Sequence, residues 1–335
     1  MRSRRSRLLA MVFSLAVLAV LAVPGYASAA RILYASGHDL DATRLATFGG
    51  NTAVEPPGVA GFDGCSDSEW ASALARTDFD VLVVGEDAPD CTLDPATYNA
   101  IANYVRGGKP IIVLGAHGEE NDFLNTVFGF STTNAAEDSD EVLSASLQPG
   151  ATGTPFAGGP TTLLSANLTE ILGSTPGTTI YSGPEGTWVF MVPFGAGTVT
   201  YLGWDFCCFN ADTTADDWYR VLDRATHVSS NFTIVSITRN KKKGNATITV
   251  SDQFPGDLAG SGNGVKAASS GGAVISKSVG AGQSTLLIKA KGKKKKKLNQ
   301  KGKVKLSVTI TYTPTGGSPH SQSVKVKLKK KLRKK

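Results

Sequence analysis

The sequence predicts an α/β domain followed by an all-β domain, and two apolar runs in the first half are the main evidence. Residues 79–87 (FDVLVVGED) and 109–121 (KPIIVLGAHGEEN) each pass from a continuous apolar stretch into glycine and then acidic residues. A strand that is apolar throughout is buried on both faces, which is typical of a parallel sheet covered by helices on either side. We therefore expect a doubly wound, mostly parallel sheet that places ligands at the carboxyl edge of its strands.

The first 30 residues have the pattern of an export signal. Four arginines precede an apolar run at 8–23, Pro24 ends that run, and small residues at 27–29 offer a cleavage site. A retained membrane anchor is the alternative, although the run is short for a membrane span. Both the general secretory route and the twin-arginine route stay open. We expect a secreted or cell-surface (extracytoplasmic) chain with no transmembrane segment after signal removal.

The charges divide the rest of the chain into two parts. Residues 31–228 carry 26 acidic residues against 7 Lys and Arg, whereas residues 229–335 carry 24 Lys and Arg against 2 acidic residues. The modest overall charge of +7 therefore conceals two halves of opposite sign. We place the domain boundary at residues 228–229.

All four cysteines lie in the acidic half, which in an exported protein indicates disulfides. We favour a Cys65–Cys91 bond, which leaves Cys207 and Cys208 as a vicinal pair. The alternative is a crossed pairing of Cys207 and Cys208 with the first two cysteines. A metal site is a weaker alternative, because the spacing does not resemble a zinc motif.

Strand and helix patterns alternate along the first 130 residues. Strands are expected at 31–36, 52–54, 79–85 and 109–114, and helices at 41–48, 66–75, 93–106 and 119–128. Asp94 before Pro95 is typical of a helix start, and the glycines at 107–108 are typical of a helix end. This alternation implies right-handed crossovers around a parallel sheet.

The pattern loosens between residues 131 and 176, where Gly, Thr, Ser and Pro are frequent. We expect one strand at 142–147 and otherwise an insertion over the core. Strands at 178–181, 188–193 and 198–204 should then pair as hairpins, before a closing helix at 216–226.

Three segments of the acidic half resemble class I glutamine amidotransferase-like domains, a superfamily that includes ThuA-like proteins. They are 105–115 (VRGGKPIIVLG), 123–129 (FLNTVFG) and 195–205 (GAGTVTYLGWD). The resemblance covers roughly residues 31–228 and implies a flavodoxin-like sheet.

The chain departs from this family at the catalytic residues. Amidotransferases of the family carry a nucleophilic cysteine in a Gly-x-Cys-x-Gly elbow, and His117 stands at the position of that cysteine here. No histidine lies between His117 and His227, and no Gly-x-Ser-x-Gly motif occurs. Because nucleophilic acyl transfer needs a nucleophile and a base that activates it, no catalytic residue is predicted.

Polar residues follow the strands at the point where their carboxyl ends should meet. These candidate ligand-binding residues are His38, Asp39, Glu86, Asp87, His117, Glu119, Trp204 and Asp205. Carboxylates accept sugar hydroxyls and ligate hard cations, so the rim is a candidate site for carbohydrate or a divalent cation. The alternative is that the loops of an acidic domain are acidic by default. No other cofactor is predicted.

Tryptophans offer a second candidate feature for carbohydrate binding. Trp188, Trp204 and Trp218 are aromatic residues that could stack on sugars. Trp218 fits the core better, because it lies on the apolar side of the closing helix, whereas Trp204 directly precedes Asp205 at the rim.

The basic half reads as a β-sandwich. Seven strands are expected at 232–239, 245–250, 264–268, 273–279, 284–289, 303–312 and 323–328, with a turn at 257–262 and no helix. Alternation places Val304, Leu306, Val308 and Ile310 on one face. The segments 239–250, 301–306 and 313–317 are similar to an immunoglobulin-like module of exported bacterial proteins, which implies an accessory or surface-associated role.

Lysine runs in the basic half suggest a polyanionic partner. Residues 293–297 are five lysines in an expected loop, and 329–335 form a basic tail. Solvated charge is the plain alternative, and nucleic acid is not expected, because aromatic residues for base stacking are scarce. We therefore expect an exported, non-catalytic binding or scaffold protein attached to a polyanionic cell envelope or extracellular polysaccharide. The alternative function is a metal-assisted carbohydrate-active enzyme that uses the acidic rim.

Overall fold

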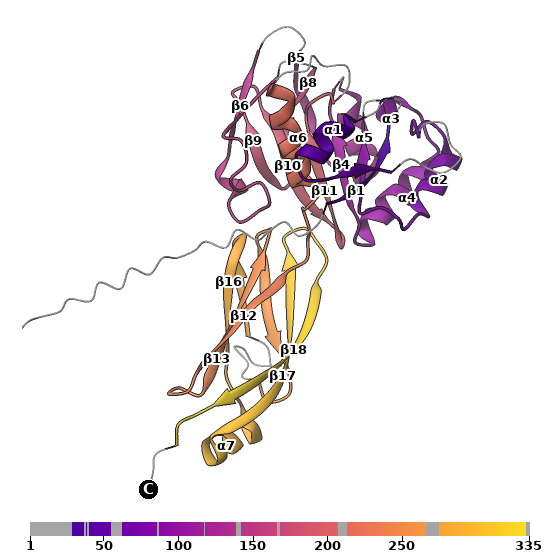
Figure 1. Cartoon of the computed structure of the whole chain (residues 1–335). Helices are drawn as coiled ribbons and strands as arrows, with labels where there is room; N and C mark the ends of the chain where they lie inside the picture. Colours follow the sequence, from indigo (N-terminus) through magenta and orange to yellow (C-terminus); the bar gives the residue numbers. More distant parts are fainter. Residues whose placement is uncertain are drawn as a thin grey trace, which may run out of the picture.

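The structure is a computed structural model, and it describes residues 29–36, 38, 40–54, 62–85, 87–116, 118–138, 142–165, 168–206, 213–265 and 275–332. All but the last two residues of the expected signal sequence lie outside these ranges. Within them, no helix has both the length and the apolar character that a bilayer span needs. The chain forms an α/β body and, beyond residue 229, an elongated β-sandwich (Figure 1).

Five parallel strands form the first half of a large sheet. In sheet order they are β2 (Thr52–Ala53), β1 (Arg31–Ala35), β3 (Val81–Val84), β4 (Pro110–Leu114) and β11 (Gly197–Leu202). Every residue of β3 and β11 is buried. The two apolar runs of the sequence are therefore neighbouring parallel strands, as predicted.

Helices cover both faces of this parallel half. The first face carries α1 (Ala42–Thr47) and α6 (Thr213–Ala225), which share one apolar core with Val81 and Val83. The second face carries α2 (Asp67–Leu74), α4 (Pro95–Arg106) and α5 (Glu119–Phe128), which pack on Leu82 and Val84. Because successive side chains of β3 alternate between the two cores, the sheet is covered on both sides. A short helix, α3 (Asp87–Asp90), follows β3.

An antiparallel half continues the same sheet. It contains β10 (Thr187–Phe194), β9 (Thr178–Ser182), β6 (Ser144–Leu147), β7 (Thr162–Leu164), β8 (Thr169–Ser174) and β5 (Thr133–Asp138), with a 3-10 turn η1 (Pro149–Ala151). The expectation of a loose insertion at 131–176 is therefore wrong. These strands are short and rich in threonine, which favours strands, and buried Leu163, Ile171 and Leu172 tie them into the core.

Two antiparallel sheets form the sandwich. One contains β12 (Thr233–Asn240), β13 (Asn245–Asp252) and β16 (Gly282–Ile288); the other contains β15 (Ile275–Val279), β14 (Gly256–Ser261), β17 (Lys303–Pro314) and β18 (His320–Lys329). The face predicted for 303–312 is buried between them. The turn expected at 257–262 is wrong, because this segment is β14 with Leu258 buried in the sandwich core. Of the strand expected at 264–268, Val265 forms an isolated bridge to Ala290 and residues 266–268 lie outside the described ranges.

The five lysines at 293–297 lie in a helix, α7 (Gly292–Lys301), and not in the expected loop. Lysine is a good helix former. Leu298 is buried against the sandwich core, and Gly302 ends the helix with a positive φ of 65°. One anchoring leucine and a glycine cap therefore outweigh the repulsion between neighbouring lysines.

The sandwich meets the α/β domain where β11 begins. Gly195 and Gly317 form an isolated bridge, and the Ser318 N–H donates to the Gly195 carbonyl at 2.7 Å. Ser230 Oγ donates to the Ala196 carbonyl at 2.5 Å, and the buried ring of Phe254 joins the core that α6 covers. The junction therefore occupies the amino edge of the parallel strands and leaves their carboxyl edge at the opposite end.

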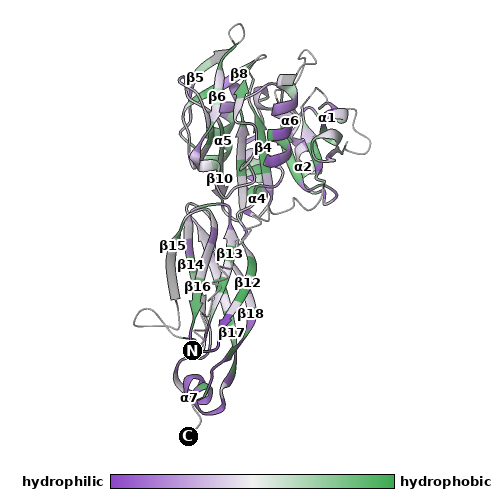
Figure 2. Ribbon diagram, turned by 60° about the vertical axis from the view of Figure 1, so that its left-hand side comes forward, coloured by the Kyte–Doolittle hydropathy of each residue, from purple (hydrophilic) through white to green (hydrophobic). Residues whose placement is uncertain are grey.

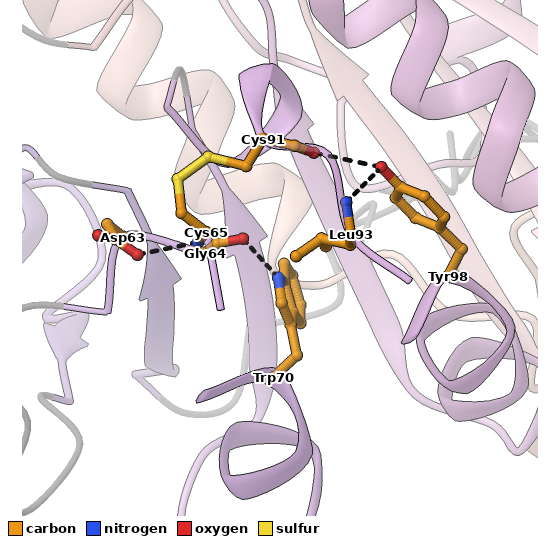
Figure 3. The surroundings of a disulfide bond; sticks show 7 residues. All are labelled: Asp63, Gly64, Cys65, Trp70, Cys91, Leu93 and Tyr98. Atoms are coloured by element: carbon orange, nitrogen blue, oxygen red, sulfur yellow. Dashed lines mark hydrogen bonds between the residues drawn. A yellow bond between two sulfur atoms is a disulfide. The ribbon is translucent and has the colours of Figure 1, made fainter. Parts of the chain in front are cut away.

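A disulfide joins Cys65 and Cys91, as predicted, with 5.0 Å between their Cα atoms (Figure 3). Trp70 Nε1 donates to the Gly64 carbonyl at 2.7 Å on one side of the bond, and Tyr98 Oη donates to the Cys91 carbonyl at 3.2 Å on the other. The disulfide therefore links two loops that are also held by hydrogen bonds from Trp70 and Tyr98. Cys207 and Cys208 lie outside the described residues.

We predict that Cys65→Ala lowers the free energy of unfolding by about 3.5 kcal/mol, because the bond closes a loop with a sequence separation of 26. Urea unfolding of the variant and the wild type measures the difference. The Cys65→Ala/Cys91→Ala double variant is the control, and it should lose about the same amount. Peptide mapping without reduction should yield a Cys65–Cys91 peptide, and a free thiol at either position would contradict the assignment.

Candidate functional site

The carboxyl edge of the parallel strands gathers the predicted rim residues by topology. β1, β3, β4 and β11 are neighbours and point the same way, so the segments after them meet at one edge. His38 is exposed, and its backbone N–H donates to Ser36 Oγ at 3.3 Å. Glu119 is exposed at the start of α5. Asp39, Glu86 and His117 lie outside the described residues, as does the side chain of Asp87.

The other two predicted rim residues are buried. Asp205 is 5% exposed, and its backbone N–H donates to the Leu168 carbonyl at 2.9 Å. Trp204 is 1% exposed, and its Nε1 donates to the Ser165 carbonyl at 2.8 Å. The structure therefore places both residues beneath the edge and not on its surface.

The three candidate stacking tryptophans form a buried stack. The rings of Trp204 and Trp218 are 5.6 Å apart and nearly parallel, and those of Trp188 and Trp218 are 6.2 Å apart. Trp188 and Trp218 are fully buried like Trp204. No face of these rings is open to a sugar, so the expected platform is part of the core. The three rings stabilise the fold by burying a large aromatic surface in the core.

Two buried glutamates lie directly behind the turn that follows β4. Glu120, in the first turn of α5, is 1% exposed, and Glu170, in β8, is fully buried. Glu120 Oε1 accepts the Ala116 N–H at 3.1 Å, and Glu170 Oε2 accepts the Tyr201 hydroxyl at 2.7 Å. Gly115 leaves room for that hydroxyl, because a Cβ at this position would overlap it.

The environment of this acid pair favours the protonated state of Glu120. Burial raises the pKa of Glu120 well above its ordinary value of 4.5, and the negative charge of Glu170 raises it further. Its hydrogen bonds to backbone N–H groups act in the opposite direction but are weaker. Among the described residues, none forms a hydrogen bond with Oε2 of Glu120. A neutral Glu120 therefore stabilises the turn after β4 without a second buried charge.

The acid pair was missed in the sequence although a signal was present. Glu120 shares a helix face with Phe123, Leu124 and Val127, at spacings of three, four and seven residues. Glu170 directly precedes Ile171 and Leu172 in β8, and all three are buried. An acidic residue on the apolar face of a helix is expected to be buried. The prediction instead named the exposed neighbour Glu119, because the segment that contains it directly follows a strand.

The described residues offer no ready-made metal site. Within those ranges, no group of three or more His, Cys, Asp or Glu side chains is arranged to hold a metal ion. The acid pair supplies two carboxyl groups and a phenol, fewer oxygen ligands than the six to eight that Ca²⁺ takes. The environment of the acid pair therefore favours a protonated Glu120 over a metal-binding carboxylate.

Comparisons with known proteins do not assign the chain to a family. No family model and no curated protein matches it. A GH42 beta-galactosidase from G. stearothermophilus has a TM-score of 0.31 and 12% identity over 64% of this chain and 32% of that chain. A cytoplasmic protein from Salmonella typhimurium LT2 has a TM-score of 0.41 and 11% identity over 59% and 98%. The chain spans about a third of the length of the beta-galactosidase, and similarities this weak carry no function.

We predict that the tryptophans are inaccessible in the native chain. All four, including Trp70, are 1% exposed or less, so acrylamide should quench native fluorescence several-fold less than it quenches the urea-unfolded chain. Oligosaccharides should leave the emission spectrum unchanged. A native quenching constant close to the unfolded one would show that the edge opens and exposes Trp204.

We predict that Glu120→Gln stabilises the fold above about pH 5. The folded state raises the pKa of Glu120 above its ordinary value of 4.5. The contribution of Glu120 to the free energy of unfolding is therefore fully present below pH 4.5 and declines as the pH rises toward the folded pKa. Glutamine cannot ionise, so the advantage of the variant should grow by up to about 1.4 kcal/mol per pH unit in that window.

Urea unfolding between pH 4 and pH 8 measures this advantage. Glu119→Gln, a change of the exposed neighbour, is the matched control; because the charge of Glu119 is only the smallest of the causes that raise the pKa of Glu120, this variant should differ from the wild type far less than Glu120→Gln does. If Glu120→Gln is destabilised equally at all pH values, Glu120 serves the fold as a charged group and the assignment is wrong.

Proposed function

We propose that this protein is an exported, non-catalytic binding or scaffold protein that attaches to an anionic cell envelope through its β-sandwich. The observation that carries the proposal is the position of the junction. The sandwich joins the amino edge of the parallel strands, through Gly195, Ala196 and Phe254. An envelope-bound sandwich therefore leaves the carboxyl edge of the α/β domain uncovered and facing away from the surface.

The length of the sandwich favours attachment over mutual pairing of the two oppositely charged halves. β17 has twelve residues, which correspond to about 40 Å of strand. Its lysine-rich end, with α7, lies far from the α/β domain (Figure 1). Screening reduces interactions between exposed charges beyond about 8 Å at physiological salt. The far lysines are therefore available to an external polyanion.

The family resemblances of the two halves support the same proposal. The parallel strands have the order β2-β1-β3-β4-β11, which matches the 2-1-3-4-5 order of flavodoxin-like sheets. This order fits a class I glutamine amidotransferase-like domain in which a histidine stands at the nucleophile's position. The Cys65–Cys91 disulfide fits an oxidising, extracytoplasmic location after signal removal. The sandwich fits an immunoglobulin-like accessory module.

A metal-assisted carbohydrate-active enzyme is the second candidate, because exposed Glu119 and His38 share the carboxyl edge. Metal analysis of the purified chain and a screen of glycan turnover with and without chelator separate the two functions. Bound divalent metal together with chelator-sensitive turnover would favour the enzyme. Glycan binding without turnover would favour the binding protein.

We predict that the full chain sediments with isolated cell envelopes at about 0.1 M salt and is released at about 1 M, where the screening length falls from about 10 to about 3 Å. Quantitative blotting of pellet and supernatant measures the bound fraction. Envelopes stripped of their anionic polymers are the control and should not retain the chain. Retention that salt does not change, or the absence of retention at low salt, would contradict the proposal.

A further inference from the structure

Lysines from four segments converge at the end of the sandwich that is far from the α/β domain. We call this the distal end: the turn between β12 and β13 (241–243), the residues after β16 (289–291), α7, and the paired ends of β17 and β18 with the residues up to 331. Figure 2 shows this region, around α7, in the hydrophilic colour. The only two acidic residues of the basic half lie toward the other end, because Asp252 ends β13 and Asp257 begins β14.

Two lysine pairs stand directly opposite each other on the outer face of β17 and β18. Lys303 is opposite Lys329, and Lys305 is opposite Lys327; all four are exposed, and Lys325 continues the row. Like charges directly opposite each other destabilise a sheet. The two consecutive lysine pairs therefore reduce the stability of the sheet. Packing does not require them, because Val304 and Leu306 on the inner face already anchor β17 in the sandwich core. A sequence that breaks a local rule without a structural gain indicates a function.

We call the exposed row of Lys303, Lys305, Lys325, Lys327 and Lys329 the lysine ladder. Two adjoining depressions lie beside it. One, of about 600 Å³, lies between the β12–β13 turn and α7; the other, of about 450 Å³, lies where α7 enters β17. Lys330 lines both, and the described residues that line the two together include eleven lysines and no acidic residue. Lys330 Nζ donates to Asn299 Oδ1 at 2.8 Å, so its charge has a neutral partner.

We propose that the distal end binds a linear phosphodiester polymer of the cell envelope, whose charges lie along the lysine ladder and in the two depressions. This inference rests on the proposed function, because it takes the sandwich as the attaching unit. Along β18 a lysine recurs every second residue, about 6.8 Å apart, and such a row suits a ligand that carries charge at regular intervals. Ammonium groups bind phosphate oxygens as point charges.

Other polyanions fit the distal end less well. The sandwich aromatics Phe232, Phe254 and Tyr312 are buried, so they offer no platform for nucleic-acid bases. Leu332, together with Leu287 two residues before the segment 289–291, is an exposed large apolar side chain near this end, so little apolar surface is present to enter a bilayer. The depressions are concave, whereas a flat lipid surface would contact only the outermost lysines.

The test compares three forms of the full mature chain for binding to poly(glycerol phosphate). The ladder variant is Lys305→Gln/Lys327→Gln. The control, Arg31→Gln/Lys109→Gln, removes the same charge from exposed positions of the α/β domain. We expect the ladder variant to bind about tenfold more weakly at 0.1 M salt, with a salt dependence shallower by about 1.4 in log–log slope, as for the loss of two phosphate contacts. The control should bind like the wild type.

Melting temperatures accompany the binding measurements. Because the ladder substitutions remove repulsion, the variant should melt at or above the wild-type temperature, so weaker binding cannot be explained by unfolding. Poly-L-glutamate and phosphatidylglycerol vesicles are the competing ligands. Wild-type binding to either that is as tight as to poly(glycerol phosphate) overturns the proposal, and so does a ladder variant that binds like the wild type.

Failure of this inference and failure of the proposed function give different results. A chain that sediments with envelopes in a salt-dependent way, while the ladder variant does so equally, overturns the distal site and leaves envelope attachment standing. A chain that binds the polymer through the ladder but is not retained by envelopes supports the site and contradicts envelope attachment.

Discussion

Burial of the parallel strands on both faces determines where every other feature of the α/β domain lies. Side chains of β1, β3, β4 and β11 feed two separate cores, one under α6 and one under α4 and α5. Each fully buried Val or Leu contributes about 1.5–3 kcal/mol, whereas a surface ion pair such as Arg220–Asp217 contributes about 1 kcal/mol or less. The apolar strands therefore dominate, and only the two edges of the sheet are left for other contacts.

These two edges have different uses. The amino edge is closed by the sandwich, with Phe254 packed into the α/β core and Ser318 bonded to Gly195. The carboxyl edge carries the loops after the strands, and the Cys65–Cys91 bond holds two of them. The same topology places the sandwich at one edge and leaves the other edge uncovered by it.

The acid pair and the lysine ladder are the two places where the chain breaks the usual rules of protein stability. Glu120 and Glu170 are both buried, and the raised pKa of Glu120 favours a protonated carboxyl there, which removes one of the two negative charges. The lysine ladder sets like charges opposite each other on exposed strands, where water and salt reduce the cost. The first violation is hidden and acts on the fold, whereas the second is exposed and is available to a partner.

The sequence alone predicted the alternation of strands and helices, the burial of 81–85 and 111–114 and the charge division, because each depends on local periodicity or composition. It favoured the Cys65–Cys91 pair but left a crossed pairing open, and the structure decided between them. The sequence did not reveal β5, β7 and β8, because short threonine-rich strands gain their stability from distant neighbours such as β10. Only the tertiary structure brought Glu170 to Glu120, buried Trp204, and turned the lysines of 293–297 into a helix anchored by Leu298. The proximity of Glu170 to Glu120 and the burial of Trp204 depend on contacts between residues far apart in the chain, which local periodicity does not encode, whereas the apolar face around Glu120 did indicate that this carboxyl is buried.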